Sequence, residues 1–132
     1  MKIIAGNFKS NKNRADSIGY LNALDSRLNS APKELLDSRK IYIFPAISAL
    51  VANDFANLTL GAQNAHFAEG GAFTGEISLC HLSEFHIKTI LIGHSERRTL
   101  FGESDEVVAK KFAFFAERNF EIFLCIGENL AI

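Results

Sequence analysis

Cysteine is scarce in this sequence, and neither sign of charge is in excess. Cys80 and Cys125 are the only two cysteines among 132 residues, and they do not form a CxxC pair. This pattern favours reduced thiols over a disulfide framework. Lysine and arginine total 14 against 15 acidic residues, which gives a formal net charge of -1. The balanced charge argues against nucleic acid or an anionic membrane as the main partner.

Targeting signals and long apolar runs are also absent from the sequence. The first residues, from Met1 to Ile4, do not follow the pattern of a signal peptide. No apolar stretch approaches the roughly 18 residues that a membrane span needs. We therefore expect a cytoplasmic protein with no membrane partner. The chain has 132 residues, 48% of them hydrophobic, which is enough for one domain with a substantial core.

Motifs for metal ions and phosphate loops are missing too. His81 and His86 are five residues apart, so they would not share a helix face as a pair of metal ligands would. Cys80 next to His81 adds no spacing typical of zinc, and we expect His66 to be a solvated loop residue. Neither GxGxxG nor GxxxxGKS/T occurs in the sequence. We expect no metal site and no cofactor.

What the sequence does have is a regular alternation of strand-like and helix-like segments. Runs rich in Ile, Leu, Phe and Val are typical of parallel strands that helices cover. Ser104, followed by two acidic residues, predicts the start of the last helix. An open α/β domain would end with a further helix, and the alternation stops before one. The expected strands are 2–7, 40–45, 58–64, 89–93 and 121–126, and the expected helices are 15–30, 48–55, 75–87 and 105–119.

Polar residues follow the expected strands at the points where the strands end. In parallel α/β folds, ligands meet the carboxyl ends of the strands. An amide, an ammonium, an imidazole and a carboxylate on one rim would suit an anionic, oxygen-rich small molecule. Each residue by itself also has an ordinary interpretation, as a solvated side chain or a turn former. The residues on this rim are Asn7, Lys9, Pro45, Gln63, Asn64, His94, Ser95, Glu96 and Glu128.

His94 has the most informative position on this rim. It ends the strand 89–93, and the residues 95–98 can open a helical turn directly behind it. The positive potential of a helix N-terminus disfavours the imidazolium form and keeps the ring neutral. A neutral imidazole can donate a hydrogen bond to a carbonyl oxygen on which charge develops. The alternative is that His94 only caps this turn, and the spacing does not decide between the two.

Four segments resemble the signature segments of the triosephosphate isomerase family, in the family's order and approximate separations. They are GNFKSN (6–11), GAFTGE (71–76), IGHSERR (92–98) and CIGE (125–128). The resemblance covers the whole chain but only the N-terminal half of a (β/α)₈ barrel, which has about 250 residues. It implies a single partial-barrel domain over 1–132, in which five of the eight parallel strands are present with helices outside them. The alternation of strands and helices would then stop after the fifth strand because only the N-terminal half of the barrel is present.

The resemblance also implies a role for each matched rim residue. Asn7 and Lys9 would bind the substrate, with the Lys9 ammonium near the phosphate and the developing enediolate. His94 would polarise the carbonyl and shuttle protons between the two oxygens, and a neutral histidine at a helix N-terminus is a known feature of this family. Ser95 and Glu96 would order His94 and Lys9 from behind.

Further residues take their implied roles from the barrel's second half and from a twin subunit. Cys125 would lie under the catalytic base without taking part in proton transfer. Thr74, at the tip of its segment, would reach into the twin subunit and support that subunit's Asn7 and Lys9. Around this dimer interface, salt links would form between Glu76, Arg97 and Glu103.

The activity implied is that of an intramolecular aldose–ketose isomerase. It would interconvert dihydroxyacetone phosphate and D-glyceraldehyde 3-phosphate in glycolysis and gluconeogenesis, as a homodimer when full length. The family's general base, a Glu after strand six, and its phosphate loops lie beyond strand five, and Glu128 belongs to another segment. We therefore expect this 132-residue chain to be inactive by itself. The alternatives are a truncated, non-catalytic binding or vestigial protein, or a complete flavodoxin-like signalling module.

Overall fold

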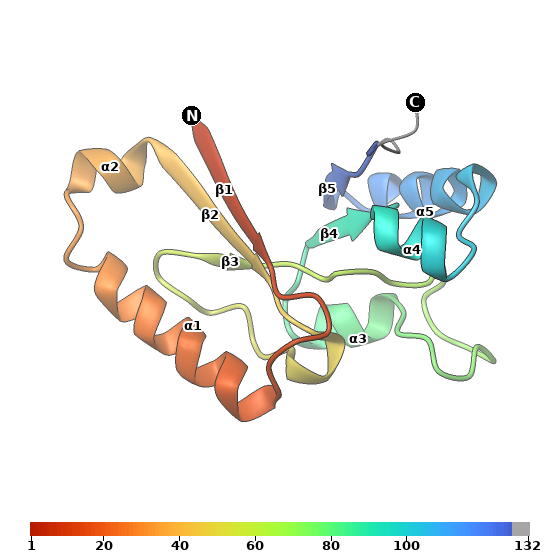
Figure 1. Ribbon diagram of the computed structural model, residues 1–132, viewed down its shortest axis with the longest axis horizontal. Coiled ribbons are helices and arrows are strands. Elements are labelled where there is room, and N and C mark those ends of the chain that lie inside the picture. Colours follow the sequence, from red (N-terminus) through yellow and green to blue (C-terminus); the bar gives the residue numbers. More distant parts are fainter. Residues whose placement is uncertain (128–132) are drawn as a thin grey trace.

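In the part of the chain that the structure describes, five strands form the inner layer and the helices lie outside them (Figure 1). The computed structural model describes residues 1–127. One sheet contains β1 (Lys2–Asn7), β2 (Arg39–Phe44) and β3 (Thr59–Leu60) in that order, and a second contains β4 (Thr89–Ile92) and β5 (Glu121–Leu124). A parallel bridge between Ala62 and Ile90 connects the two sheets.

The strand order decides between the two α/β architectures. All strand pairs within residues 1–127 are parallel, so the predicted parallel arrangement is confirmed. Strand β2 lies between β1 and β3, whereas a flavodoxin-like sheet would place β1 in that position. Sequential order is the order of a β/α barrel. Strands β1 and β5 do not pair with each other in the described residues, so the sheet is open, as the N-terminal part of a barrel would be.

Two long helices begin at side-chain caps that the sequence supplies. Asn13 accepts a hydrogen bond from the Asp16 backbone N–H at 2.8 Å, and Ser104 accepts one from the Val107 N–H at 3.2 Å. The second cap confirms the predicted start of the last helix. The helices are α1 (Arg14–Leu28), α2 (Lys33–Asp37), α3 (Leu79–Glu84), α4 (Ser95–Leu100) and α5 (Asp105–Glu117), with a 3-10 turn η1 (Ile47–Ala49).

The prediction of a helix over 48–55 was wrong. Only η1 forms there, because Asn53 makes hydrogen bonds across the fold instead of along a helix. Its N–H donates to the Phe85 carbonyl, and its side-chain oxygen accepts the Leu60 N–H, both at 2.9 Å. The Leu60 N–H, a backbone donor of the third strand, is thereby used in a hydrogen bond to the Asn53 side chain. Strand β3 is two residues long instead of the predicted 58–64.

Two further helices differ from the predictions. The helix expected over 75–87 is limited to α3, because Ser78 caps it: the Ser78 N–H donates to Nδ1 of His81 at 2.9 Å, in a capping box. Helix α2 was not predicted. It has five residues and none of them is buried, so it carries no apolar stripe that a periodicity could reveal.

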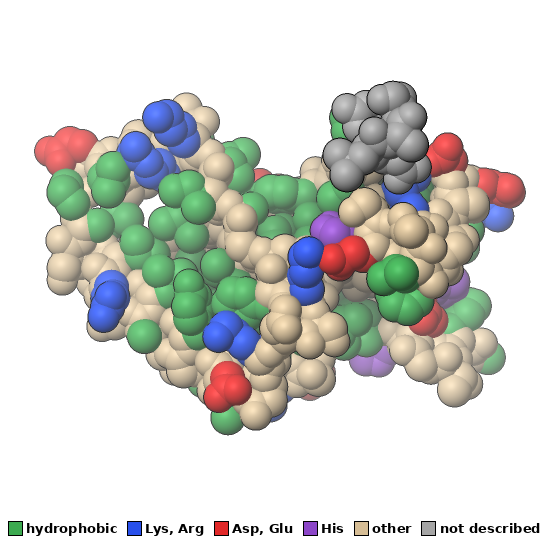
Figure 2. Space-filling view, viewed as in Figure 1, with side chains coloured by type: hydrophobic (Ala, Val, Ile, Leu, Met, Phe, Trp, Pro, Cys, Tyr) green, Lys and Arg blue, Asp and Glu red, His purple; other side chains and the backbone are tan. Residues whose placement is uncertain are grey.

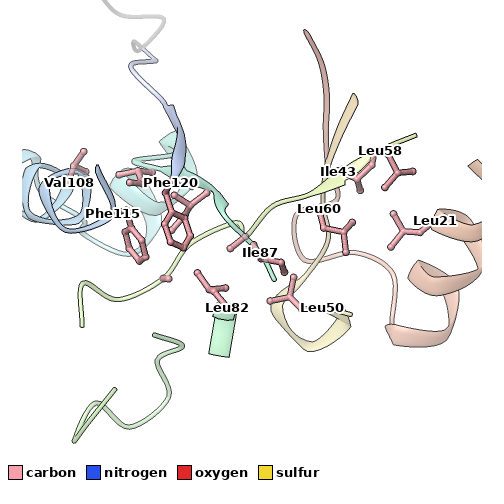
Figure 3. Close-up of a cluster of buried hydrophobic side chains, with 14 residues drawn as sticks. Leu21, Ile43, Leu50, Leu58, Leu60, Leu82, Ile87, Val108, Phe115 and Phe120 are labelled. Atoms are coloured by element: carbon pink, nitrogen blue, oxygen red, sulfur yellow. The ribbon is translucent and has the colours of Figure 1, made fainter. Parts of the chain in front are cut away.

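The main hydrophobic core lies between the strands and the outer helices (Figure 3). Leu21 of α1, Leu82 of α3 and Phe115 of α5 are each fully buried in it. The outer ends of the partial barrel are different, because Ile3 of β1 is 58% exposed and Ile126, after β5, is 82% exposed. No helix within residues 1–127 is long and apolar enough to cross a membrane.

Candidate active site at the carboxyl ends of the strands

The loop after β1 holds Lys9 in a conformation that residues with a Cβ rarely adopt. Its φ is +56°, in the left-handed region. The side-chain oxygen of Asn7 accepts the Lys9 backbone N–H at 2.8 Å, and the Gln63 side chain donates to the Lys9 carbonyl at 2.8 Å. Both backbone groups of Lys9 are therefore held by side chains, one from the end of β1 and one from the segment after β3.

The Lys9 side chain points to the loop after β4. Its Nζ lies 2.7 Å from Oε1 of Glu96, in a half-exposed ion pair. The hydrogen bond from Lys9 is the main cause that holds the pKa of the Glu96 carboxyl below its usual range. The ammonium of Lys9 thus has a fixed position beside His94, because Glu96 also contacts the histidine.

His94 follows β4 and caps α4. A helical turn directly behind His94 was predicted from the sequence. Its Nδ1 accepts the backbone N–H of Glu96 at 3.1 Å and lies 3.7 Å from Oε2 of the same residue. Because Nδ1 uses its lone pair in the cap, the ring proton is assigned to Nε2, which stays available as a donor. Capping and electrophilic catalysis are therefore compatible roles for this ring, since the cap selects the tautomer.

The turn before His94 depends on Gly93 and Arg98. Gly93 has a φ of +75°, and a Cβ placed on it would come within 2.7 Å of the Arg98 guanidinium. Arg98 donates to the Gly93 carbonyl at 2.7 Å and to the Cys125 carbonyl at 3.2 Å. The same guanidinium therefore joins the carboxyl ends of β4 and β5 and fixes the backbone that carries His94.

Lys9, His94 and Glu96 border a small cavity of about 150 Å³. On the face shown in Figure 2, basic, acidic and histidine side chains meet near the middle. A larger hollow of about 670 Å³ lies at the amino ends of the strands, next to α2 and the start of β5. Chemistry in parallel α/β folds occurs at the carboxyl ends, so the smaller cavity is the candidate site. Its lining includes Asn7, Lys9, Gln63, Asn64, His94, Glu96, Arg97 and Phe101.

Two other rim predictions have different surroundings. Ser95 opens α4 and is exposed, and within residues 1–127 its hydroxyl makes no hydrogen bond to His94 or Lys9. Cys125 is partly buried at the end of β5, with Sγ 3.8 Å from the Phe123 carbonyl. Burial raises the pKa of its thiol. Glu128 lies outside the described residues.

The residues predicted at a dimer interface divide into two groups. Thr74 and Glu76 are exposed on the loop between β3 and α3. Arg97, by contrast, pairs within its own chain, with Nε 2.9 Å from Oε2 of Glu103. The prediction that His66 would be solvated was wrong, because its ring is partly buried and packs on Phe73 with centroids 4.1 Å apart.

A buried cluster behind the rim was missed by the sequence reasoning. Lys111 of α5 is 3% exposed, and its Nζ lies 2.7 Å from both Oε2 of Glu103 and Oδ1 of Asn64. Burial alone would raise the pKa of Glu103, but hydrogen bonds from Lys111 and Arg97 outweigh it and hold the pKa below its usual range. The available signal was a lysine in the apolar stripe of α5, between Val108 and Phe115.

Metal-binding chemistry finds no support in the described part of the chain. Within residues 1–127, no group of three or more His, Cys, Asp or Glu side chains could hold a metal ion. The rim instead offers the imidazole of His94, the ammonium of Lys9 and the amide side chains of Asn7, Gln63 and Asn64. These are donors suited to an anionic or carbonyl-containing ligand.

Comparison with known proteins gives a consistent result over the whole chain. The family model for triosephosphate isomerase matches residues 2–132. The triosephosphate isomerase of Helicobacter hepaticus is 49% identical over 132 residues, which are 100% of this chain and 55% of that protein. Those of Sulfurovum sp. and Nitratiruptor sp. are each 49% identical, over 98% and 97% of this chain and 55% and 52% of their own lengths. The chain spans about half the length of the curated relatives it matches.

Proposed function

The chain belongs to the triosephosphate isomerase family, and on that premise we propose that its rim supplies part of the active site of an aldose–ketose isomerase. The substrate class is a small phosphorylated triose, dihydroxyacetone phosphate or D-glyceraldehyde 3-phosphate, as in glycolysis and gluconeogenesis. The observation that carries the proposal is the contact of Glu96 with both partners: its carboxylate with the Lys9 ammonium and its N–H with Nδ1 of His94. A cation and a ring N–H donor are thereby fixed beside each other.

This arrangement suits the formation of an enediolate. A base removes a proton from the hydroxyl-bearing carbon next to the carbonyl, and negative charge develops on the carbonyl oxygen. That oxygen then takes up a proton and becomes a hydroxyl, while the original hydroxyl gives up its proton and becomes the new carbonyl. The base returns its proton to the former carbonyl carbon. The Nε2–H of His94 would donate to that oxygen. Lys9, with Asn7, would attract the phosphate and the developing charge. No redox cofactor is needed, because only protons move.

We propose that two parts of the active site correspond to the segment of the relatives that this chain does not span. These are the general base and the loops that enclose the phosphate. Glu96 is unsuited to act as the base, because its carboxylate is paired with Lys9. Catalysis needs the base and the donor in place together. We therefore propose that the 132-residue chain has no isomerase activity above background by itself. Its residues 1–132 would be one partial-barrel domain.

The proposed assembly follows from the same membership. The full-length enzyme would be a cytoplasmic homodimer, with Thr74 and Glu76 on the exposed loop meeting the twin subunit. Arg97 is held by Glu103 in its own chain and would present its remaining guanidinium nitrogens to the interface. No nucleic acid or membrane takes part in this proposal.

Reconstitution from two pieces tests the proposed function. The 132-residue chain is mixed with the C-terminal piece of the Helicobacter hepaticus relative, starting after the segment that the chain matches. Each piece should be inactive, and the mixture should interconvert the two triose phosphates in a coupled assay. A folded complex of the two pieces without any turnover would contradict the proposal and favour the non-catalytic alternative.

A further inference from the structure

Gln63 makes a pair of hydrogen bonds that no role so far accounts for. Its Nε2 donates to the Lys9 carbonyl at 2.8 Å and to the Phe44 carbonyl at 3.0 Å, so both amide hydrogens are used. Phe44 ends β2, and its carbonyl also accepts the Phe8 N–H at 3.0 Å. The Gln63 amide thereby connects the end of β2 to the loop that carries Lys9.

The conformation of Lys9 explains why such a connection matters. A left-handed φ at a residue with a Cβ is unfavourable unless the surroundings hold it. Asn7 holds the Lys9 N–H, and Glu96 holds the ammonium, but the ion pair is half exposed. Gln63 is the described side chain that holds the Lys9 carbonyl. Without it, the backbone could relax and turn the ammonium away from Glu96.

Gln63 is itself well placed to act as a fixed point. Its neighbour Asn64 is 8% exposed and accepts a hydrogen bond from the buried Lys111. Lys111 and Arg97 both bind Glu103. This buried cluster therefore fixes Asn64, the neighbour of Gln63, and Arg97, the neighbour of Glu96. Gln63 and Glu96, which both bind Lys9, are thus connected to the same cluster.

We propose that Gln63 is a positioning residue: by fixing the Lys9 carbonyl, it keeps the Lys9 ammonium at the site. The catalytic consequence rests on the proposed function, whereas the geometric one does not. The competing interpretation is that Gln63 only connects β2 and β3, in which case its loss would weaken the fold without any selective effect on Lys9.

The geometric consequence is tested by labelling amines in the 132-residue chain, with mass spectrometry as the readout. Gln63→Met keeps the length of the side chain and removes both donors. We expect it to raise the rate of acylation of Lys9 roughly two- to fivefold, because an exposed ion pair of this strength is lost. Lys110, an exposed lysine that pairs with Glu106 on α5, serves as the internal reference and should not change.

A matched variant separates this effect from general loosening. Asn53→Leu also removes two hydrogen bonds from a side chain to the backbone, at Leu60 and His86, away from Lys9. It should leave the Lys9 rate unchanged. Gln63→Asn, which is too short to reach both carbonyls, should behave as Gln63→Met does. An unchanged Lys9 rate in both Gln63 variants, or an equal rise at Lys9 and Lys110, would overturn the proposal.

A double-mutant cycle in the reconstituted pair tests the catalytic consequence. Gln63→Met should lower kcat/KM roughly tenfold to a hundredfold, as misplacement of a substrate-binding group does. In the Lys9→Ala background, it should cause no further loss, because the group it positions is gone. Equal losses in both backgrounds would assign Gln63 a purely structural role. A wild-type pair without turnover would contradict the proposed function, while the labelling result would still decide the role of Gln63.

Discussion

Strands β1 and β4 both deliver residues to the candidate site, but they differ sharply in how they are packed. All four residues of β4 are buried, and Ile90 is 0% exposed. Strand β1 pairs on one side with β2 and leaves Ile3 and Ile4 58% and 51% exposed. The first strand is an open edge, and the fourth is part of the finished core.

This difference shows how each half of the site is held. His94 is held in position by the buried strand β4, which it follows, and by the helix α4, which it caps. Lys9 follows the edge strand and depends on side-chain contacts with Asn7, Gln63 and Glu96. The histidine is therefore positioned by a buried strand and its own helix cap, whereas the lysine depends on hydrogen bonds from side chains and on a half-exposed ion pair. We expect a C-terminal piece that covers β1 to change the surroundings of Lys9 more than those of His94.

The largest expected effect is on turnover and tests whether both halves of the site are required. In the reconstituted pair, His94→Gln and Lys9→Ala should each lower kcat by roughly 10²–10⁴-fold, because each removes a group that stabilises the developing charge. The control is His86→Gln, which changes an exposed histidine after α3 and should keep nearly the full rate. Similar losses from both histidine substitutions would leave His94 as a capping residue only.

The second prediction concerns stability and tests the packing contrast directly. Ile90→Ala should lower the free energy of unfolding by about 2–5 kcal/mol, because it leaves a cavity in the core. Ile3→Ala, the same change on the edge strand, should cost about 0.5 kcal/mol or less. Urea unfolding of the 132-residue chain, followed by circular dichroism, measures both. Adding the C-terminal piece should raise the cost of Ile3→Ala; equal costs without that piece would mean that β1 is already packed.

The sequence predicted the parts of the fold that depend on local pattern. Strand 2–7, the helix that Ser104 caps and the turn behind His94 follow from periodicity, cap chemistry and the order of elements. Residues at the strand ends could be placed on one rim for the same reason. The predictions failed where contacts between distant residues decide: Asn53 takes the Leu60 N–H, and neither the lost helix nor the shortened strand leaves a local signal.

The contacts within the site were harder to predict than its members. The resemblance implied that Glu96 would order Lys9 and His94, but no spacing in the sequence shows a carboxylate 2.7 Å from the lysine. Gln63 was placed on the rim without a role, because its partners are two backbone carbonyls distant in the sequence, that of Lys9 in the loop after β1 and that of Phe44 at the end of β2. Lys111 lies in an apolar stripe, and its burial becomes understandable only with Glu103 and Asn64 beside it.

The smallest expected effect concerns the ion pair that joins the two halves of the site. Lys9 is the main cause of the lowered pKa of Glu96, whereas the lowered pKa of Glu103 depends on Lys111 and Arg97. Lys9→Ala should therefore move the titration midpoint of Glu96 upward, toward the ordinary carboxyl range, and leave that of Glu103 in place. Carbon-13 NMR of labelled glutamate carboxyl groups measures both midpoints in the same sample.

The sign of the accompanying change in stability follows from linkage. A carboxyl with a lower pKa in the folded state than in the unfolded state contributes stability above its unfolded pKa, and that contribution is lost as the pH falls through the folded pKa. In the wild-type chain, acidification should therefore weaken the connection between Lys9 and Glu96. In Lys9→Ala, this part of the acid dependence should be absent, while the part due to Glu103 remains. If both midpoints moved equally, Lys9→Ala would be disturbing the buried cluster as well; if neither moved, the edge strand would not be holding Lys9 against Glu96.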